Sequence, residues 1–107
     1  MFNSYIKNVN AEEAYKLINN NKELVILDVR TQEEYDGGHI PGAKLIPVQV
    51  LPMKLSELKE YKDKPVLVYC ASGGRSPRAV DTLVKSDFTN IYHLSRGISS
   101  WRYTVAR

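Results

Sequence analysis

The chain has 107 residues, of which 43% are hydrophobic and 25% charged, and this composition predicts one compact domain over residues 1–107 with its own hydrophobic core. Its single cysteine, Cys70, excludes an internal disulfide, and two histidines beside it are too few for a structural zinc site, so we expect a free thiol and no bound metal. The net charge of +3 is spread along the chain, which favours a small anionic ligand and argues against a nucleic-acid partner.

Helical patterns recur along the chain. In "NAEEAYKLINN" (10–20), Asn10 precedes Glu13 by three residues, a capping-box pattern that predicts a helix start. Further helices are expected at "TQEEYD" (31–36), at "PMKLSELKEY" (52–61) and at "SPRAVDTLVKSD" (76–87). In the last of these, Ser76 is the expected cap and Pro77 lies in the first turn.

Apolar runs between these helices predict strands that are buried on both faces. They are "ELVILDVR" (23–30), "AKLIPV" (43–48), "PVLVYC" (65–70) and the shorter "NIYHL" (90–94), whereas "SYIKNV" (4–9) carries no strand prediction. Buried strands that alternate with helices are typical of an α/β domain with a mostly parallel sheet. This architecture places Cys70 at the carboxyl end of a central strand, where ligands bind in open α/β sheets.

The segment after Cys70 favours a reactive sulfur over a structural one. Two glycines, Gly73 and Gly74, allow the chain to curl from strand to helix. Successive backbone amides in such a turn can surround an anion, with the amino end of a helix behind them. We therefore expect a thiol whose pKa lies below the ordinary value of about 8.5.

Three segments together resemble the motifs of the rhodanese-like domain family. They are "DVRTQEEYDGGHIPGA" (28–43), "CASGGRS" (70–76) and "IYHLSRGISSW" (91–101), and they occur in the order and spacing of that family. The resemblance implies the rhodanese-like three-layer α/β fold, a five-stranded parallel sheet with helices on both faces. It also implies a sulfurtransferase that works through a persulfide and needs no cofactor.

By this resemblance, Cys70 is the catalytic nucleophile. It would attack the sulfane sulfur of a small anionic donor such as thiosulfate, release sulfite, and pass the sulfur to cyanide or a thiol, with a protein persulfide as a further candidate partner. Arg75 and Ser72 would bind the oxygens of the donor, since the planar guanidinium of arginine can donate two hydrogen bonds to an oxyanion. The implied substrate-binding residues are those of the loop: Ala71, Ser72, Gly73, Gly74, Arg75 and Ser76.

The upstream motif supplies supporting residues. Asp28 either orients the cysteine loop through backbone hydrogen bonds or caps a turn. Arg30 and Glu34 are four residues apart, and we expect a salt bridge between them. His39 is assigned to loop packing, because a thiolate that is already ionised needs no general base. Pro41 and the glycine after it predict a type II turn.

Two positions depart from the family pattern. Arg96 stands where the family usually has a glycine, so it either adds positive charge near the mouth of the active site or reshapes a loop. Asp87 replaces the glycine that usually closes the helix after the active-site loop, and aspartate tolerates the left-handed backbone expected there.

Two other functions are weighed against sulfur transfer. Cysteine-dependent phosphatases carry H-C-x5-R, whereas here Tyr69 precedes Cys70 and only four residues separate Cys70 from Arg75. A non-catalytic interaction module is the second alternative, although such modules commonly lose the cysteine. A start without signal-peptide features, the absence of an apolar run of about 20 residues and the free thiol predict a cytoplasmic protein that does not bind membranes.

Overall fold

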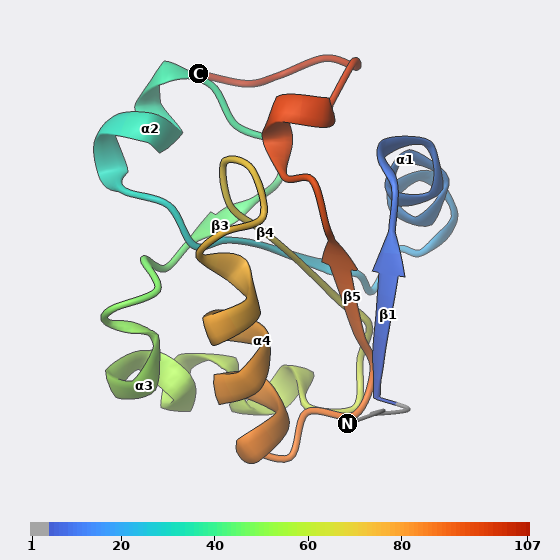
Figure 1. The fold of residues 1–107 in the computed structure, drawn as a ribbon. Coiled ribbons are helices and arrows are strands. Elements are labelled where there is room, and N and C mark those ends of the chain that lie inside the picture. Colours follow the sequence, from blue (N-terminus) through green and yellow to red (C-terminus); the bar gives the residue numbers. More distant parts are fainter. Residues whose placement is uncertain (1–4) are drawn as a thin grey trace.

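The computed structural model describes residues 5–107, and Figure 1 traces them from blue to red. Strands and helices alternate along the chain as the sequence predicted. In chain order they are β1 (Ile6–Val9), α1 (Ala11–Asn20), β2 (Val25–Asp28), α2 (Gln32–Gly37), β3 (Lys44–Leu45), α3 (Leu51–Lys54), the 3₁₀ helix η1 (Leu55–Tyr61), β4 (Val66–Tyr69), α4 (Ser76–Lys85), β5 (Ile91–Leu94) and the 3₁₀ helix η2 (Ile98–Ser100).

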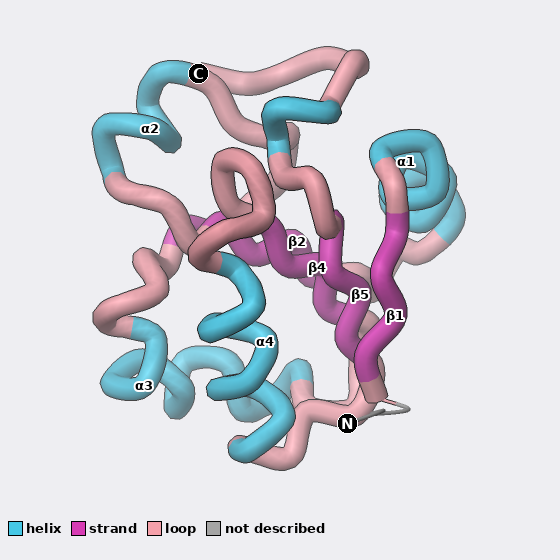
Figure 2. The backbone as a smooth tube through the Cα atoms, viewed as in Figure 1, coloured by secondary structure: helices cyan, strands magenta, loops and turns pink. Residues whose placement is uncertain are grey.

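The sheet has five parallel strands in the order β1-β5-β4-β2-β3, with β4 at its centre (Figure 2). Successive side chains of β4 point to opposite faces, as in any strand. Val66 and Val68 pack with α3, η1 and α4 on one face, whereas Leu67 and Tyr69 pack with α1 on the other. The chain therefore has the predicted α/β fold, with helices on both faces of a parallel sheet.

Side-chain caps begin the first two helices. The Asn10 side chain accepts a hydrogen bond from the Glu13 amide at 2.8 Å, and Glu13 accepts one from the Asn10 amide at 2.9 Å, so the predicted capping box is confirmed. A second capping box, between Thr31 and Glu34, begins α2. Each box satisfies amide groups that have no partner within the helix.

Three elements differ from the prediction. β1 was not predicted, because only one of its four residues is buried and no apolar run marks it. The strand expected over 43–48 is regular only at Lys44–Leu45, since Pro47 has no amide hydrogen for the ladder. The helix expected over 52–61 is one short α-helix, α3, followed by the 3₁₀ helix η1.

Two turns have the predicted backbone. Gly42 has a φ of 86°, and the Ala43 amide donates to the Ile40 carbonyl at 3.0 Å, which is the pattern of the type II turn. Asp87 has a φ of 71° and takes the left-handed position just after α4. The polar side chain of aspartate makes this backbone less costly than it would be for a β-branched residue.

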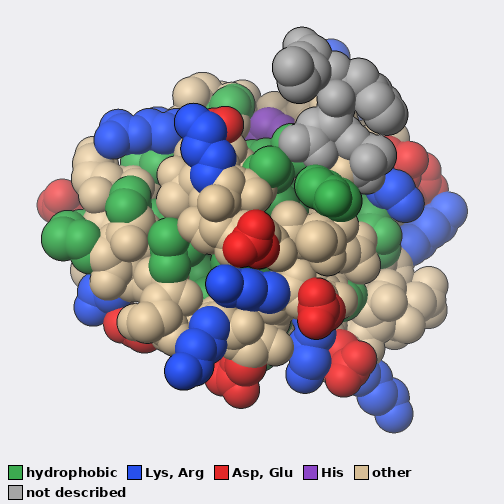
Figure 3. All heavy atoms as spheres, turned by 90° about the horizontal axis from the view of Figure 1, so that it is seen from below, with side chains coloured by type: hydrophobic (Ala, Val, Ile, Leu, Met, Phe, Trp, Pro, Cys, Tyr) green, Lys and Arg blue, Asp and Glu red, His purple; other side chains and the backbone are tan. Residues whose placement is uncertain are grey.

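Charges of both signs are interspersed on the surface. Figure 3 shows the molecule from below the view of Figure 1, where Lys and Arg side chains lie among Asp and Glu side chains. Some of them form ion pairs, such as Lys85 with Asp81 at 3.0 Å on α4. Over residues 5–107, no helix has the length and apolar character needed to cross a bilayer.

Candidate active site

Cys70 directly follows the central strand β4, and its sulfur faces the start of α4. The backbone amides of Gly73 and Ser76 donate to Sγ at 3.2 and 3.3 Å, and the Ser76 hydroxyl oxygen lies 3.3 Å from Sγ. The cysteine is buried, with only 1% of its surface exposed. Donors from the loop and from the first turn of α4 thus converge on one sulfur atom.

Two opposing effects set the pKa of Cys70. Burial raises it, because an apolar environment disfavours the charged thiolate. The hydroxyl and amide of Ser76, and the backbone amides of Arg75 and Gly73, lower it by hydrogen bonding to the thiolate. These hydrogen bonds prevail, so the pKa of Cys70 lies below its ordinary value. A lowered pKa increases the fraction of thiolate, which is the nucleophilic form of cysteine.

The segment after β5 fixes the cysteine loop in place. The Ile98 amide donates to the Cys70 carbonyl at 3.0 Å. At two points the backbones approach so closely that only glycine fits. A Cβ on Gly73, whose φ is 97°, would collide with the Ser95 carbonyl oxygen, and a Cβ on Gly97 would collide with the backbone of the cysteine loop. The position of the amide donors therefore depends on contact with residues 95–98.

The guanidinium of Arg75 is bound to Glu34 of α2. Its two terminal nitrogens donate to the two carboxylate oxygens at 2.8 Å each, a bidentate pair. Hydrogen bonding from Arg75 lowers the pKa of Glu34 to about 2. The predicted salt bridge between Arg30 and Glu34 is wrong, because Arg30 pairs with the nearer and fully buried Asp28. Arg75 thus connects the cysteine loop to α2.

Asp28 forms a buried network below the cysteine. It accepts hydrogen bonds from the Arg30 amide at 3.0 Å and from the Arg30 guanidinium at 2.8 and 3.0 Å. The Tyr69 hydroxyl donates to Asp28 at 2.7 Å and accepts from the Ile40 amide at 3.1 Å. Asp28 therefore caps the turn to Arg30, which was one of its two predicted roles. Among the described residues, its hydrogen bond nearest to the cysteine loop is the one from Tyr69, the residue before Cys70.

The contacts of His39 are with α2 and the C-terminal segment. Its ring stacks on that of Tyr35 with 3.6 Å between the ring centroids, and Nδ1 lies 2.8 Å from the Tyr35 carbonyl oxygen. Its backbone pairs with Ala106 in an antiparallel bridge. These contacts agree with loop packing.

The outer side of the cysteine loop carries the exposed residues Ser72 and Gly74. Arg96 is also exposed, and its Cα lies beside Gly73. Among the described residues, no acidic side chain forms an ion pair with Arg96. Its φ is not positive, so the replacement of the family glycine does not strain the backbone. Within this part of the chain, Arg96 thus provides an unpaired positive charge beside the loop.

Sequence reasoning missed two contacts of Ser76. This residue is not the cap of α4, which falls one residue earlier. Its hydroxyl lies 3.3 Å from Cys70 Sγ and 2.6 Å from His93 Nε2, and His93 Nδ1 lies 3.1 Å from Asn8 Oδ1. The available signal was the alternation in β5, where position 93 shares a face with the buried Ile91. A histidine at an inward position of a buried strand needs polar partners.

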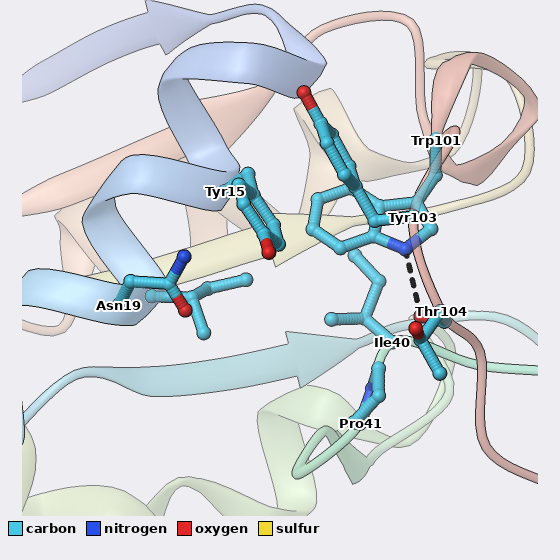
Figure 4. Close-up of a pocket in the computed structure, with 8 residues that line it drawn as sticks. Tyr15, Asn19, Ile40, Pro41, Trp101, Tyr103 and Thr104 are labelled. Carbon is cyan, nitrogen blue, oxygen red and sulfur yellow. Dashed lines mark hydrogen bonds between the residues drawn. The ribbon is translucent and has the colours of Figure 1, made fainter.

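A pocket of about 140 Å³ lies across the sheet from the sulfur (Figure 4). The rings of Tyr15 and Tyr103, which both line the pocket, stack with 3.9 Å between centroids, and Trp101 Nε1 donates to the Thr104 carbonyl at 3.0 Å. None of its lining residues belongs to the cysteine loop, so it is separate from the sulfur site. They are Tyr15, Ile18, Asn19, Ile40, Pro41, Trp101, Tyr103 and Thr104.

The amino-acid sequence is similar to those of known proteins. The family model of the rhodanese-like domain matches residues 10–104. The uncharacterized protein YqhL of Bacillus subtilis is 43% identical over 76 residues, which cover 71% of this chain and 59% of the relative. Thiosulfate sulfurtransferase GlpE of Coxiella burnetii is 35% identical over 101 residues, which cover 90% of this chain and 87% of the relative.

Solved structures are similar over nearly the whole chain. A rhodanese-related protein from Thermoplasma volcanium has a TM-score of 0.81 at 33% identity, covering 94% of this chain and 97% of that one. A protein from Rhodopseudomonas palustris, described as of unknown function and a possible tyrosine phosphatase, has a TM-score of 0.81 at 26% identity, covering 92% and 81%. Among the sequence relatives, the Bacillus protein is matched only in part, and this chain spans about three fifths of its length.

Proposed function

This chain belongs to the rhodanese-like domain family, and on that premise we propose that it is a sulfurtransferase that carries sulfane sulfur on Cys70 as a persulfide. One observation carries the proposal: the amides of Gly73 and Ser76 converge on Cys70 Sγ, and hydrogen bonding lowers the pKa of this buried thiol. A thiolate with aligned donors is equipped to attack a sulfur atom and to hold the anionic sulfur that results.

The proposed reaction has two steps. In the first, the Cys70 thiolate attacks the outer sulfur of thiosulfate, the S–S bond of thiosulfate breaks, and sulfite leaves with the bonding electron pair. Cys70 is then a persulfide whose outer sulfur carries the negative charge. In the second step, cyanide or a thiolate attacks that outer sulfur, and Cys70 leaves as a thiolate. The cycle needs no metal and no redox cofactor.

We propose that the donor binds at the loop Ala71 to Ser76, with its oxygens near the exposed side. Arg75 and Arg96 differ in how far their guanidinium groups are free to bind the donor. Arg75 has both terminal nitrogens on Glu34, whereas Arg96 is exposed and unpaired among the described residues. Arg96 therefore supplies positive charge for the donor oxygens, together with Ser72. Arg75 contributes through the donors that Glu34 leaves free.

The KM values of Arg96→Ala for thiosulfate and for cyanide test whether Arg96 binds the donor oxygens. Removing a cation that contacts only an anionic donor should raise KM for thiosulfate and leave KM for cyanide nearly unchanged. Unchanged KM values for both substrates would place the donor oxygens elsewhere.

The two rival functions have weaker support. A phosphatase loop has five residues between cysteine and arginine, whereas this loop has four and directs two amides to one sulfur atom. A non-catalytic module would not require a thiol whose pKa is lowered by aligned donors. Because Cys70 is a free thiol, we also propose a reducing compartment, the cytoplasm, as its location.

Intact mass spectrometry tests the proposed function most directly. After incubation with thiosulfate, the wild-type protein should gain the mass of one sulfur atom and lose it again on addition of cyanide. Cys70→Ser is the matched control and should gain nothing. Hydrolysis of an aryl phosphate is measured in parallel. A protein that hydrolyses aryl phosphate faster than it forms a persulfide would overturn the proposal in favour of the phosphatase.

A further inference from the structure

His93 is a buried titratable side chain that the proposed reaction has not yet used. It lies on β5 with 8% of its surface exposed, on the face of the sheet that α4 covers. Its two ring nitrogens each have one polar neighbour: Nε2 lies 2.6 Å from Ser76 Oγ, and Nδ1 lies 3.1 Å from Asn8 Oδ1. The chain thus brings Asn8, His93, Ser76 and Cys70 into one continuous row.

The donor and acceptor in each hydrogen bond of this row follow from the Asn8 amide oxygen at one end of it. Asn8 Oδ1 can only accept, so Nδ1 of His93 carries the hydrogen and Nε2 has a free lone pair. Nε2 therefore accepts from the Ser76 hydroxyl. The hydroxyl hydrogen is then committed to His93, and Ser76 Oγ accepts from the Cys70 thiol. The thiol proton accordingly points along a path that ends at the imidazole.

We propose that His93 receives the thiol proton of Cys70 through the Ser76 hydroxyl, as a positioning residue for the sulfur transfer proposed above. The S–H bond breaks and leaves its electron pair on sulfur, while the proton moves to Ser76 Oγ. At the same time, the hydroxyl proton of Ser76 moves to His93 Nε2. The products are a thiolate, a serine hydroxyl that donates to it, and an imidazolium.

Every hydrogen bond of the row is kept after the transfer. The Ser76 hydroxyl now donates to Sγ, Nε2–H donates to Ser76 Oγ, and Nδ1–H still donates to Asn8 Oδ1. No side chain has to move, because the protons shift along bonds that already exist. The amide of Ser76 donates to Sγ in both states. The row is therefore a relay with two complete arrangements.

Burial disfavours the charged imidazolium form of His93 before the transfer. Burial lowers the pKa of His93, and no charged residue of the described chain adds to this effect. The side chains that face its ring nitrogens are the neutral Asn8 from β1 and Ser76 from α4, and Cys70 at the end of β4 is the titratable group behind Ser76. The nearby cation Arg75 is bound to Glu34. A neutral imidazole is the form that can accept a proton.

The test is the pH profile of Cys70 alkylation by iodoacetamide, measured on the full chain. His93→Gln keeps a hydrogen-bond acceptor for Ser76 but cannot take up a proton, so alkylation at pH 7 should fall by about tenfold or more, since a positioned proton acceptor contributes about 10²–10⁴-fold to such steps. Asn8→Asp places a carboxylate next to Nδ1–H, which favours the imidazolium, and should raise the rate at pH 7.

Lys7→Gln is the matched control for Asn8→Asp. It changes the net charge by the same amount on the same strand, but its ammonium lies over the ring of Tyr92, 5.8 Å from the centroid, away from His93. Its alkylation profile should match the wild type. If His93 only makes a structural hydrogen bond, His93→Gln would keep a wild-type profile and Asn8→Asp would be no faster than Lys7→Gln, and either result overturns the relay.

The melting temperature of each variant and the formation of a persulfide are measured alongside alkylation. If His93→Gln lowers the melting temperature by more than a few degrees, the decision rests on Asn8→Asp against Lys7→Gln, whose side chains are exposed. Because alkylation needs no sulfur donor, the relay is judged separately from the proposed function. Shifted alkylation profiles in a protein that forms no persulfide would support the relay and reject the sulfurtransferase.

Discussion

Replacing Gly73 with alanine adds one methyl group where the cysteine loop touches Ser95. Gly73 has a φ of 97°, a backbone that costs a residue with a side chain about 1–3 kcal/mol. The new Cβ would also collide with the Ser95 carbonyl oxygen. Overpacking of this kind costs about 1–3 kcal/mol. Together these penalties, about 2–6 kcal/mol, are large enough that the loop should shift to relieve them.

A shifted loop moves the Gly73 amide, which donates to Cys70 Sγ at 3.2 Å. Loss of one such backbone or side-chain donor to a developing anion costs about 10²–10³-fold in turnover in other enzymes. We therefore expect Gly73→Ala to lower thiosulfate:cyanide turnover by about 10²-fold. The midpoint of Cys70 alkylation against pH should rise toward the ordinary thiol value of about 8.5, because one hydrogen bond to the thiolate is lost.

Gly74→Ala is the steric control. This neighbouring glycine does not have a positive φ, and no atom lies within 4 Å of the position that its Cβ would take. Its melting temperature and the midpoint of Cys70 alkylation should stay close to those of the wild type. If Gly73→Ala keeps the turnover and thiol titration of the wild type, or if both substitutions shift the alkylation midpoint equally, the Gly73 amide does not set the reactivity of Cys70.

Three further results are expected. Cys70→Ser should lose all sulfur transfer while keeping its circular dichroism spectrum, since a hydroxyl is nearly isosteric but forms no persulfide; transfer by the folded variant would contradict covalent catalysis. Arg75→Ala should raise KM for thiosulfate more than KM for an uncharged donor, and Glu34→Gln should lower KM for thiosulfate by freeing the Arg75 guanidinium. If Arg75→Ala impairs the reactions of both donors equally, Arg75 only holds the shape of the cysteine loop. The pKa of Glu34, about 2 against an ordinary 4.5, means that its ion pair stabilises the fold fully above pH 4.5 and no longer does so near pH 2. The melting temperature of Glu34→Gln should thus lie below the wild type at pH 7 and converge with it in acid, whereas a gap that is constant with pH would contradict this.

Much of the fold could be predicted because its signals are local. The Asn10–Glu13 capping box, the turn at Gly42 and the left-handed Asp87 each depend on residues within a few positions of one another. The buried central strand is marked by its own apolar run. β1 was not predicted, because an edge strand with exposed side chains has no continuous apolar run. Its place in the sheet is set by pairing with β5.

The site was predictable to a lesser degree, because partner choice is not local. Glu34 lies four residues from Arg30 but pairs with Arg75, 41 residues away. The reason is that the buried Asp28 already holds the Arg30 guanidinium, and a buried carboxylate without a cation would be more destabilising than an exposed one. The contact of Ser76 with His93 is likewise formed by packing of α4 on β5, which helix-cap rules do not describe.

The pairing of β1 with β5 has a consequence for the order of folding. Asn8 and His93 are 85 residues apart, and β1 has β5 as its neighbour at the edge of the sheet. Contacts of such long range form late and slow the folding of a small protein. A chain in which β4 and α4 have met but β1 has not yet docked would hold its thiol without the Asn8 contact. By the relay proposed above, the thiol of such a chain should be alkylated more slowly than that of the complete sheet, because the contact that directs the lone pair of His93 toward Ser76 is missing. A rise in the rate of Cys70 alkylation during refolding would therefore report the docking of β1 on β5.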